Sequence, residues 1–286
     1  MSRRERTQHL VGFRGMRPDR MGRWHTVMDL NFKENCWTAG ALTENAGSLT
    51  TLNGNQYHCY VRNTTDNSFT QTDDTGMVVD FGGGTAGKNR LVIKVPYFQP
   101  DKDGRHPRIR ASASFSGLTT SNNGDYIGVG VTGYYINNAN PKNPHVTCIY
   151  DTNNKDTPTF KYYGQCIKGT YGSTGSGLDT RPSGGVATDG NNTSGVLVIE
   201  DGGQGIWICR GHDGDVIIKQ GSANVDTFRA QLAATGFTGV GADRGFYRAD
   251  SGTDYDGPYV SLWCNAGSTG GSQAVTWERL VVEVYY

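Results

Sequence analysis

A run of short β-type segments separated by glycine and aspartate constrains this chain more than any other feature. Within residues 195–221, three segments rich in β-branched and aromatic residues follow one another: Val196–Glu200, Ile206–Arg210 and Asp215–Lys219. The Asp-Gly-Gly and Asp-Gly sequences between them tolerate the positive φ angles of tight hairpins. Alternate residues of a strand point to opposite faces, and both faces of the first segment are apolar. We therefore expect three antiparallel strands covered on both sides, as in a sandwich of two sheets.

The same pattern recurs along the chain and predicts an all-β fold, a two-sheet antiparallel β-sandwich. Arg108–Phe115 alternates most clearly, with Ile109 and Ala111 on one face and Arg108 and Arg110 on the other, which indicates a half-exposed strand. Polar segments such as 63–75 indicate loops. Further strands are expected at Trp24–Phe32, Tyr57–Arg62, Gly76–Phe81, Arg90–Pro96, Asp125–Tyr135, His145–Tyr150, Thr159–Ile167, Gly236–Ala242, Tyr259–Cys264 and Val275–Tyr286.

One short helix is predicted at residues 225–236, because Asp226 can cap its start and Gly236 can end it. The chain shows no repeat of 20–50 residues and no change of composition that would mark a second domain. Glycine makes up 41 of the 286 residues, about twice the usual share, which suits many short strands and turns. We expect an extended arm at residues 1–24 followed by one sandwich domain at 25–286.

The predicted arm is strongly basic. It holds seven arginines against two acidic residues, Glu5 and Asp19, so residues 1–24 carry +5 and the remainder carries −5. Such a segment cannot bury a core by itself, and arginine suits bidentate contacts with carboxylates of a partner. Few aromatic platforms accompany the arginines, which disfavours nucleic acid. A disordered leader is the other interpretation. The residues expected to contact a partner are Arg3, Arg4, Arg6, Phe13, Arg14, Arg17, Arg20 and Arg23.

No secretory signal or membrane-spanning apolar run is evident, so we expect synthesis in a host cytoplasm and no membrane partner. The six cysteines are widely spaced and are expected to be free, buried thiols, with disulfides as the alternative. They offer no clustered zinc site, and we assign no metal site or cofactor. Calcium is an alternative at the Asp-rich turns, but none of them matches the EF-hand pattern, and solvated turns are the favoured interpretation.

The latter half resembles the concanavalin A-like, or laminin-G-like, β-sandwich superfamily. Two pieces carry the resemblance: the strand, turn, strand and turn of residues 195–215, and the closing strand Thr276–Tyr286 after Tyr259–Cys264. It implies a jelly roll of two curved antiparallel sheets, with about six or seven strands in each. Members include lectins, glycoside hydrolases, adhesion modules and surface proteins of tailed bacteriophages. The resemblance does not imply an activity, because function depends on sites that differ between members of a fold.

A glycoside hydrolase on this scaffold needs two carboxylates beside the scissile bond, about 5–5.5 Å apart in a retaining enzyme. The hydrolases of the family supply them from one strand with a Glu-x-Asp-x-x-Glu type pattern, and no part of this chain matches it. Glu278 and Glu283 lie five residues apart, which places them on opposite faces of a regular strand. Glu200 lies beside a turn, where a solvated carboxylate is ordinary. The sequence therefore predicts a protein that is not an enzyme, with a glycoside hydrolase as the enzymatic alternative.

We interpret the chain as a virion structural protein of a tailed bacteriophage, a surface-exposed capsid decoration or appendage component anchored by its arm. The expected partners are other virion proteins and copies of itself, with a trimer as the working hypothesis for the homo-oligomer. The alternative is a glycan-binding lectin or adhesin that recognises host-surface glycans. Aromatic residues near loops or strand ends are its candidate platforms, against a role in core packing. These residues are Tyr134, Tyr135, Tyr247 and Tyr255.

Overall fold

The computed structural model of the chain describes residues 22–43, 48–62, 68–81, 88–96, 107–119, 126–132, 145–151, 161–167, 186–187, 193–203, 206–211, 259–265 and 273–285. Within these residues it forms strands β1 to β16 and one turn of 3-10 helix, η2 (Phe32–Glu34). The strands of the first half are β1 (Trp24–Asn31), β2 (Gly40–Ala41), β3 (Ser48–Thr50), β4 (Gln56–Arg62), β5 (Phe69–Thr72), β6 (Gly76–Asp80), β7 (Lys88–Lys94) and β8 (Arg108–Thr119). Those of the second half are β9 (Tyr126–Thr132), β10 (His145–Asp151), β11 (Lys161–Ile167), β12 (Val186–Ala187), β13 (Gly195–Gly203), β14 (Ile206–Gly211), β15 (Tyr259–Asn265) and β16 (Ala274–Tyr285).

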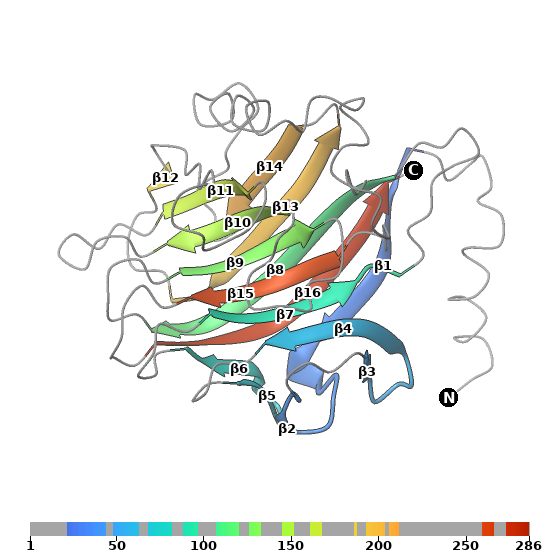
Figure 1. Ribbon diagram of the computed structural model, residues 1–286, viewed down its shortest axis with the longest axis vertical. Coiled ribbons are helices and arrows are strands. Elements are labelled where there is room, and N and C mark those ends of the chain that lie inside the picture. Colours follow the sequence, from blue (N-terminus) through green and yellow to red (C-terminus); the bar gives the residue numbers. More distant parts are fainter. Residues whose placement is uncertain are drawn as a thin grey trace.

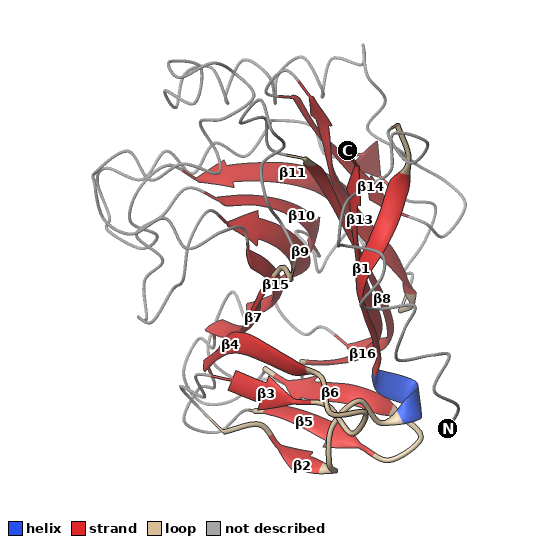
Figure 2. Ribbon diagram, turned by 90° about the vertical axis from the view of Figure 1, so that its right-hand side faces the viewer, coloured by secondary structure: helices blue, strands red, loops and turns tan. Residues whose placement is uncertain are grey.

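The strands form two antiparallel sheets that lie face to face (Figures 1 and 2). The first sheet has the order β14-β13-β8-β16-β6-β5-β2, and β1 also pairs with β16. The second sheet has the order β12-β11-β10-β9-β15-β7-β4-β3. In the first sheet β16 pairs with β8 on one side, and with β6 and then β1 along the other. This arrangement confirms the predicted two-sheet antiparallel sandwich.

Most of the predicted strands are present, with ends that move by a few residues. The first two segments of the run at 195–221 form β13 and β14 and pair antiparallel, as expected. The third segment, the helix predicted at 225–236 and the strand predicted at 236–242 lie outside the described residues. The loop predicted at 63–75 is wrong in part, because β5 lies within it and pairs with β6. A strand of four residues is too short for its alternation to stand out from a polar sequence.

The core lies between the sheets and is built from alternate residues of each strand. On β8 the predicted inward face is confirmed: Ile109, Ala111, Ala113 and Phe115 are at most 1% exposed. Its other face, which includes Arg108 and Arg110, is half-buried. The second sheet supplies the opposing apolar wall, for instance Val260 and Leu262 of β15. The largest fully buried side chains belong to Trp277, Arg90, Tyr150, Tyr259, Phe32, Phe69, Phe81, Phe115, Met28, Leu30 and Met77.

Part of the second sheet, at β4, β7 and β15, is buried on both faces. Tyr60, Val92 and Tyr259 form a separate buried cluster on the face away from the core. Arg90 lies on the same face at 2% exposure, with its guanidinium 4.1 Å from the centre of the Trp263 ring. A buried guanidinium stacked on an indole keeps a favourable cation–π contact in place of water. The rings of Tyr60, Tyr259 and Trp263 are therefore buried and are not available as an exposed platform.

Within the first sheet, Gln71 holds η2 against the β5–β6 hairpin, and Gly76 allows β6 to lie close to β16. Gln71 is buried, and its amide donates a hydrogen bond of 2.7 Å to the backbone oxygen of Phe32 in η2. Gly76 begins β6 with φ +134°, and a Cβ there would lie 2.7 Å from the backbone oxygen of Trp277. Only glycine allows β6 to approach β16 this closely with that backbone angle.

Candidate functional site: a Glu–Arg–Glu cluster

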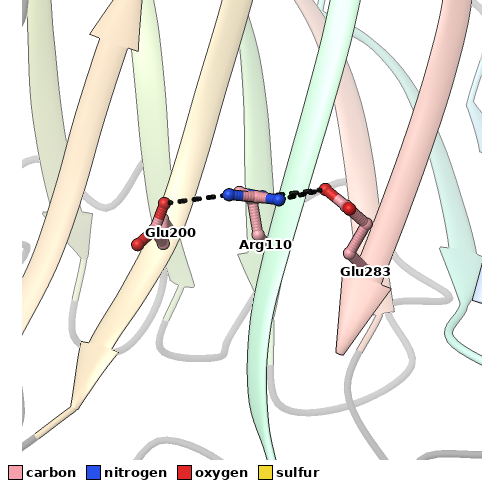
Figure 3. Close-up of polar contacts among 3 residues, drawn as sticks. All are labelled: Arg110, Glu200 and Glu283. Carbon is pink, nitrogen blue, oxygen red and sulfur yellow. Dashed lines mark hydrogen bonds and ion pairs between the residues drawn. The ribbon is translucent and has the colours of Figure 1, made fainter. Parts of the chain in front are cut away.

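Strand pairing in the first sheet brings three charged side chains together from distant parts of the sequence. Glu200 on β13 and Glu283 on β16 both lie directly opposite Arg110 on β8. Directly opposed residues share a face, so all three point to the same side of the sheet. That side faces away from the core, because their neighbours Ile109 and Ile199 are fully buried within it. Figure 3 shows the guanidinium between the two carboxylates.

The contacts of Arg110 are unequal on its two sides. Its Nε and Nη2 contact the same carboxylate oxygen of Glu283, at 2.8 and 2.7 Å, while its Nη1 lies 3.7 Å from Glu200. The side chains of Arg110, Glu283 and Glu200 keep 24, 21 and 12% of their exposure. Partial burial reduces screening by water, so these charges interact more strongly than an exposed pair. Arg110 is hydrogen-bonded to Glu283 on one neighbouring strand and makes a longer ion pair with Glu200 on the other.

The position of Glu278 corrects the sequence interpretation. On a regular strand Glu278 and Glu283 would point to opposite faces, but the pairing of β16 with β8 shifts between Trp277 and Arg279. Such a bulge adds one residue and reverses the alternation beyond it. Buried residues accordingly change from odd positions, such as Trp277, to even ones, such as Leu280. Glu278 contacts Lys33 at 2.6 Å instead of joining the cluster, so only Glu283 and Glu200 share Arg110.

This geometry does not provide the carboxylate pair of a glycoside hydrolase. An inverting enzyme holds its two carboxylates about 6.5–9.5 Å apart with the attacking water between them, and a retaining enzyme holds them closer. Here the space between Glu200 and Glu283 is occupied by the guanidinium of Arg110. Arginine stays protonated at any ordinary pH, so it can neither donate nor accept the proton of a hydrolysis step. The cluster can orient polar groups, but it lacks the proton transfer that cleavage needs.

Most of the residues proposed from the sequence fall outside the described part of the chain. This holds for Tyr134, Tyr135, Tyr247 and Tyr255, and for the arm residues Arg3, Arg4, Arg6, Phe13, Arg14, Arg17 and Arg20. Arg23 is described and exposed, one residue before β1. Trp24, placed in the arm by the sequence, is the first residue of β1. No sequence pattern connects Glu200 to Glu283, because 83 positions separate them and their proximity depends on strand order.

Thiols and metal ligands complete the description of reactive groups. Cys36, Cys59, Cys148 and Cys264 are free thiols, as predicted for these four. Burial raises the pKa of Cys59 and of Cys264 to about 12, so both remain protonated and unreactive near neutral pH. Among the described residues, no three His, Cys, Asp or Glu side chains gather closely enough to hold a metal ion. No helix in this part of the chain is long and apolar enough to cross a membrane.

No family model matches the sequence, and no curated protein matches it. Solved structures do match: the CBM2 module of the evolved Dit of Lactobacillus casei BL23 phage J-1 has 10% identity and a TM-score of 0.45, covering 93% of this chain and 98% of that one. Lectin UEA-II complexed with galactose has 10% identity and a TM-score of 0.46, with 92 and 100% covered. Endo-1,3-beta-glucanase from Streptomyces sioyaensis has 14% identity and a TM-score of 0.43, with 95 and 99% covered.

These similar structures are lectin-like β-sandwiches, of the kind that the sequence resembles. The fold assignment itself rests on the strand pairings described above. Likeness at 10–14% identity concerns the layout of the sheets and says nothing about the function of this chain.

Proposed function

We propose that this protein is a non-enzymatic, carbohydrate-binding β-sandwich. The observation that carries the proposal is the guanidinium of Arg110 between the two carboxylates of Glu200 and Glu283. Lectins and hydrolases of the superfamily that the sequence resembles both bind glycans. The Glu–Arg–Glu cluster has charged groups that can form hydrogen bonds with sugar hydroxyls. Because its two carboxylates hold an arginine, it lacks the acid and the base that cleavage requires.

The test is a glycan array probed with the full-length protein, with and without calcium, together with a reducing-sugar assay on every glycan that binds. We expect the wild type to bind at least one glycan, and we expect neither the wild type nor the Glu200→Gln variant to release reducing sugar. Absence of binding to any glycan removes the carbohydrate proposal. Reducing-sugar release that is lost in Glu200→Gln shows instead that the protein is a hydrolase.

A second proposal concerns where the sandwich acts: on the virion surface of a tailed bacteriophage, as a capsid decoration or appendage component. The observation in its favour is the position of the basic arm. Its last residues, Gly22 and Arg23, are exposed and lead into β1 beside the closing strand β16. The arm therefore joins the sandwich at its surface, where it can bind other virion proteins or a further copy of the chain, with a trimer as the working hypothesis.

Deleting residues 1–21 tests this second proposal and leaves every described strand intact. Size-exclusion chromatography with light scattering should show a loss of self-association, and co-sedimentation with particles should show a loss of retention. A variant in which the seven arm arginines become lysines is the matched control, since it keeps the charge and removes bidentate pairing. If deletion changes neither self-association nor retention, the arm is not an anchor.

A further inference from the structure

A second row of side chains crosses the first sheet next to the Glu–Arg–Glu cluster. Trp24 on β1 lies opposite Tyr285 on β16, and Tyr285 lies opposite Arg108 on β8. The neighbouring row, two residues along each strand, consists of Thr26, Glu283, Arg110 and Glu200. Both rows occupy the face that points away from the core, so aromatic and charged groups from four strands form one continuous surface.

Within this surface, two guanidinium groups lie against two neighbouring aromatic rings. The guanidinium of Arg108 lies 4.0 Å from the centre of the Tyr285 ring and 5.8 Å from that of Trp24. Arg110 lies 4.5 Å from the Trp24 ring, and the two aromatic rings are 5.5 Å apart with their planes tilted by 57°. These cation–π contacts hold the rings in place while leaving them half-buried, not fully covered.

The charges of the two rows cancel. Two arginines, Arg108 and Arg110, face two glutamates, Glu200 and Glu283, on one surface. The same surface thus offers guanidinium donors and carboxylate acceptors beside rings that present an apolar edge. A pyranose ring matches this combination, because its C–H groups pack on aromatic side chains and its adjacent hydroxyls both donate and accept hydrogen bonds.

We propose that these two rows form a binding site for a neutral saccharide; the assignment rests on the proposed carbohydrate-binding function and locates it. An acidic sugar placed here is repelled by Glu200 and Glu283, and a basic sugar is repelled by Arg108 and Arg110. In either case the repulsion offsets part of the attraction to the oppositely charged pair. The position of the rings beside both the donors and the acceptors fixes the ligand as an uncharged sugar lying across β1, β16 and β8.

The experiment compares binding of wild type, Tyr285→Ala and Thr26→Tyr to an array of neutral and acidic glycans. Thr26 is exposed in the Glu283 row, so a tyrosine there blocks the surface without disturbing the core. Thr50→Tyr is the matched control, since Thr50 is also an exposed strand threonine but lies in the second sheet. Circular dichroism shows whether each variant folds. If Tyr285→Ala does not fold, Thr26→Tyr still tests the site.

We expect the wild type to bind neutral glycans, both test variants to bind at least about tenfold more weakly, and Thr50→Tyr to bind as the wild type does. Unchanged binding in Thr26→Tyr, or a preference for acidic glycans, overturns this site and leaves the carbohydrate-binding function standing. A wild type that binds no glycan at all removes that function and the site with it.

Discussion

Replacing Arg110 with alanine is the perturbation that tests the Glu–Arg–Glu cluster most directly. The change removes two contacts below 3 Å to Glu283 and leaves two carboxylates on one face with no guanidinium between them. It also removes the contact of 4.5 Å with the Trp24 ring. We expect the free energy of unfolding to fall, because the remaining charges are only partly hydrated.

The exposure of the three side chains sets the size of this loss. Breaking a fully buried ion pair costs about 3–5 kcal/mol, whereas an exposed pair is worth about 0.2–1 kcal/mol. The side chains here keep 12–24% of their exposure, which places them between the two limits. We expect a loss of about 2–3 kcal/mol at pH 7.

Urea unfolding followed by tryptophan fluorescence measures this difference. Arg279→Ala is the matched control on the same sheet, because Arg279 contacts Asp29 at 2.6 and 2.8 Å in a pair whose side chains are 52 and 40% exposed. Its loss should stay below about 1 kcal/mol despite equally short distances. Equal losses in the two variants would refute the argument from burial.

Three further predictions concern the packing of the sandwich. Gly76→Ala should destabilise the protein by about 2–4 kcal/mol, because the new Cβ adds steric overlap to backbone strain. Gly40 has a similar φ of +131° but open space around it, so Gly40→Ala should cost only about 1–2 kcal/mol. Equal urea midpoints for the two variants would contradict this. Gln71→Leu should cost about 0.5–1.5 kcal/mol, because the Phe32 carbonyl of η2 loses its shorter hydrogen bond and keeps only that from the Asn35 N–H at 3.2 Å; an unchanged midpoint would exclude that role. The pKa of Cys59 and of Cys264 is raised to about 12 in the folded state. The unfolded state releases these protons above about pH 8.5, so the free energy of unfolding should fall between about pH 9 and 12. Both thiols should resist iodoacetamide at pH 8 by peptide mapping, and labelling of the native protein would show that they are accessible.

The long strands were predictable because burial of one side of a sheet makes apolar and polar residues alternate along each strand. β8 shows this most clearly, since its inward residues alternate with arginine and serine. The two-residue strands β2 and β12 carry no such period and were missed. The run at residues 195–221, the most informative part of the sequence, is not central in the first sheet: β14 lies at its end, whereas β16 has three strand neighbours.

The charged cluster was not predictable from the sequence, because it depends on register. Glu200 meets Arg110 only if β13 pairs with β8 in one alignment, and a shift of one residue would turn these side chains to opposite faces. Glu283 reaches the same arginine only because the bulge near Trp277 resets the alternation of β16. No local pattern near either glutamate encodes these two conditions.

The place of β16 has a consequence for synthesis. Its partners β1, β6 and β8 are all translated well before it, yet each leaves an edge open until residues 274–285 emerge from the ribosome. The nascent chain must therefore keep three unpaired strand edges apart, a state that chaperones recognise and that aggregates readily. A premature stop just before β16 would leave β1, β6 and β8 made but the first sheet unassembled, which makes such a product a substrate for proteolysis.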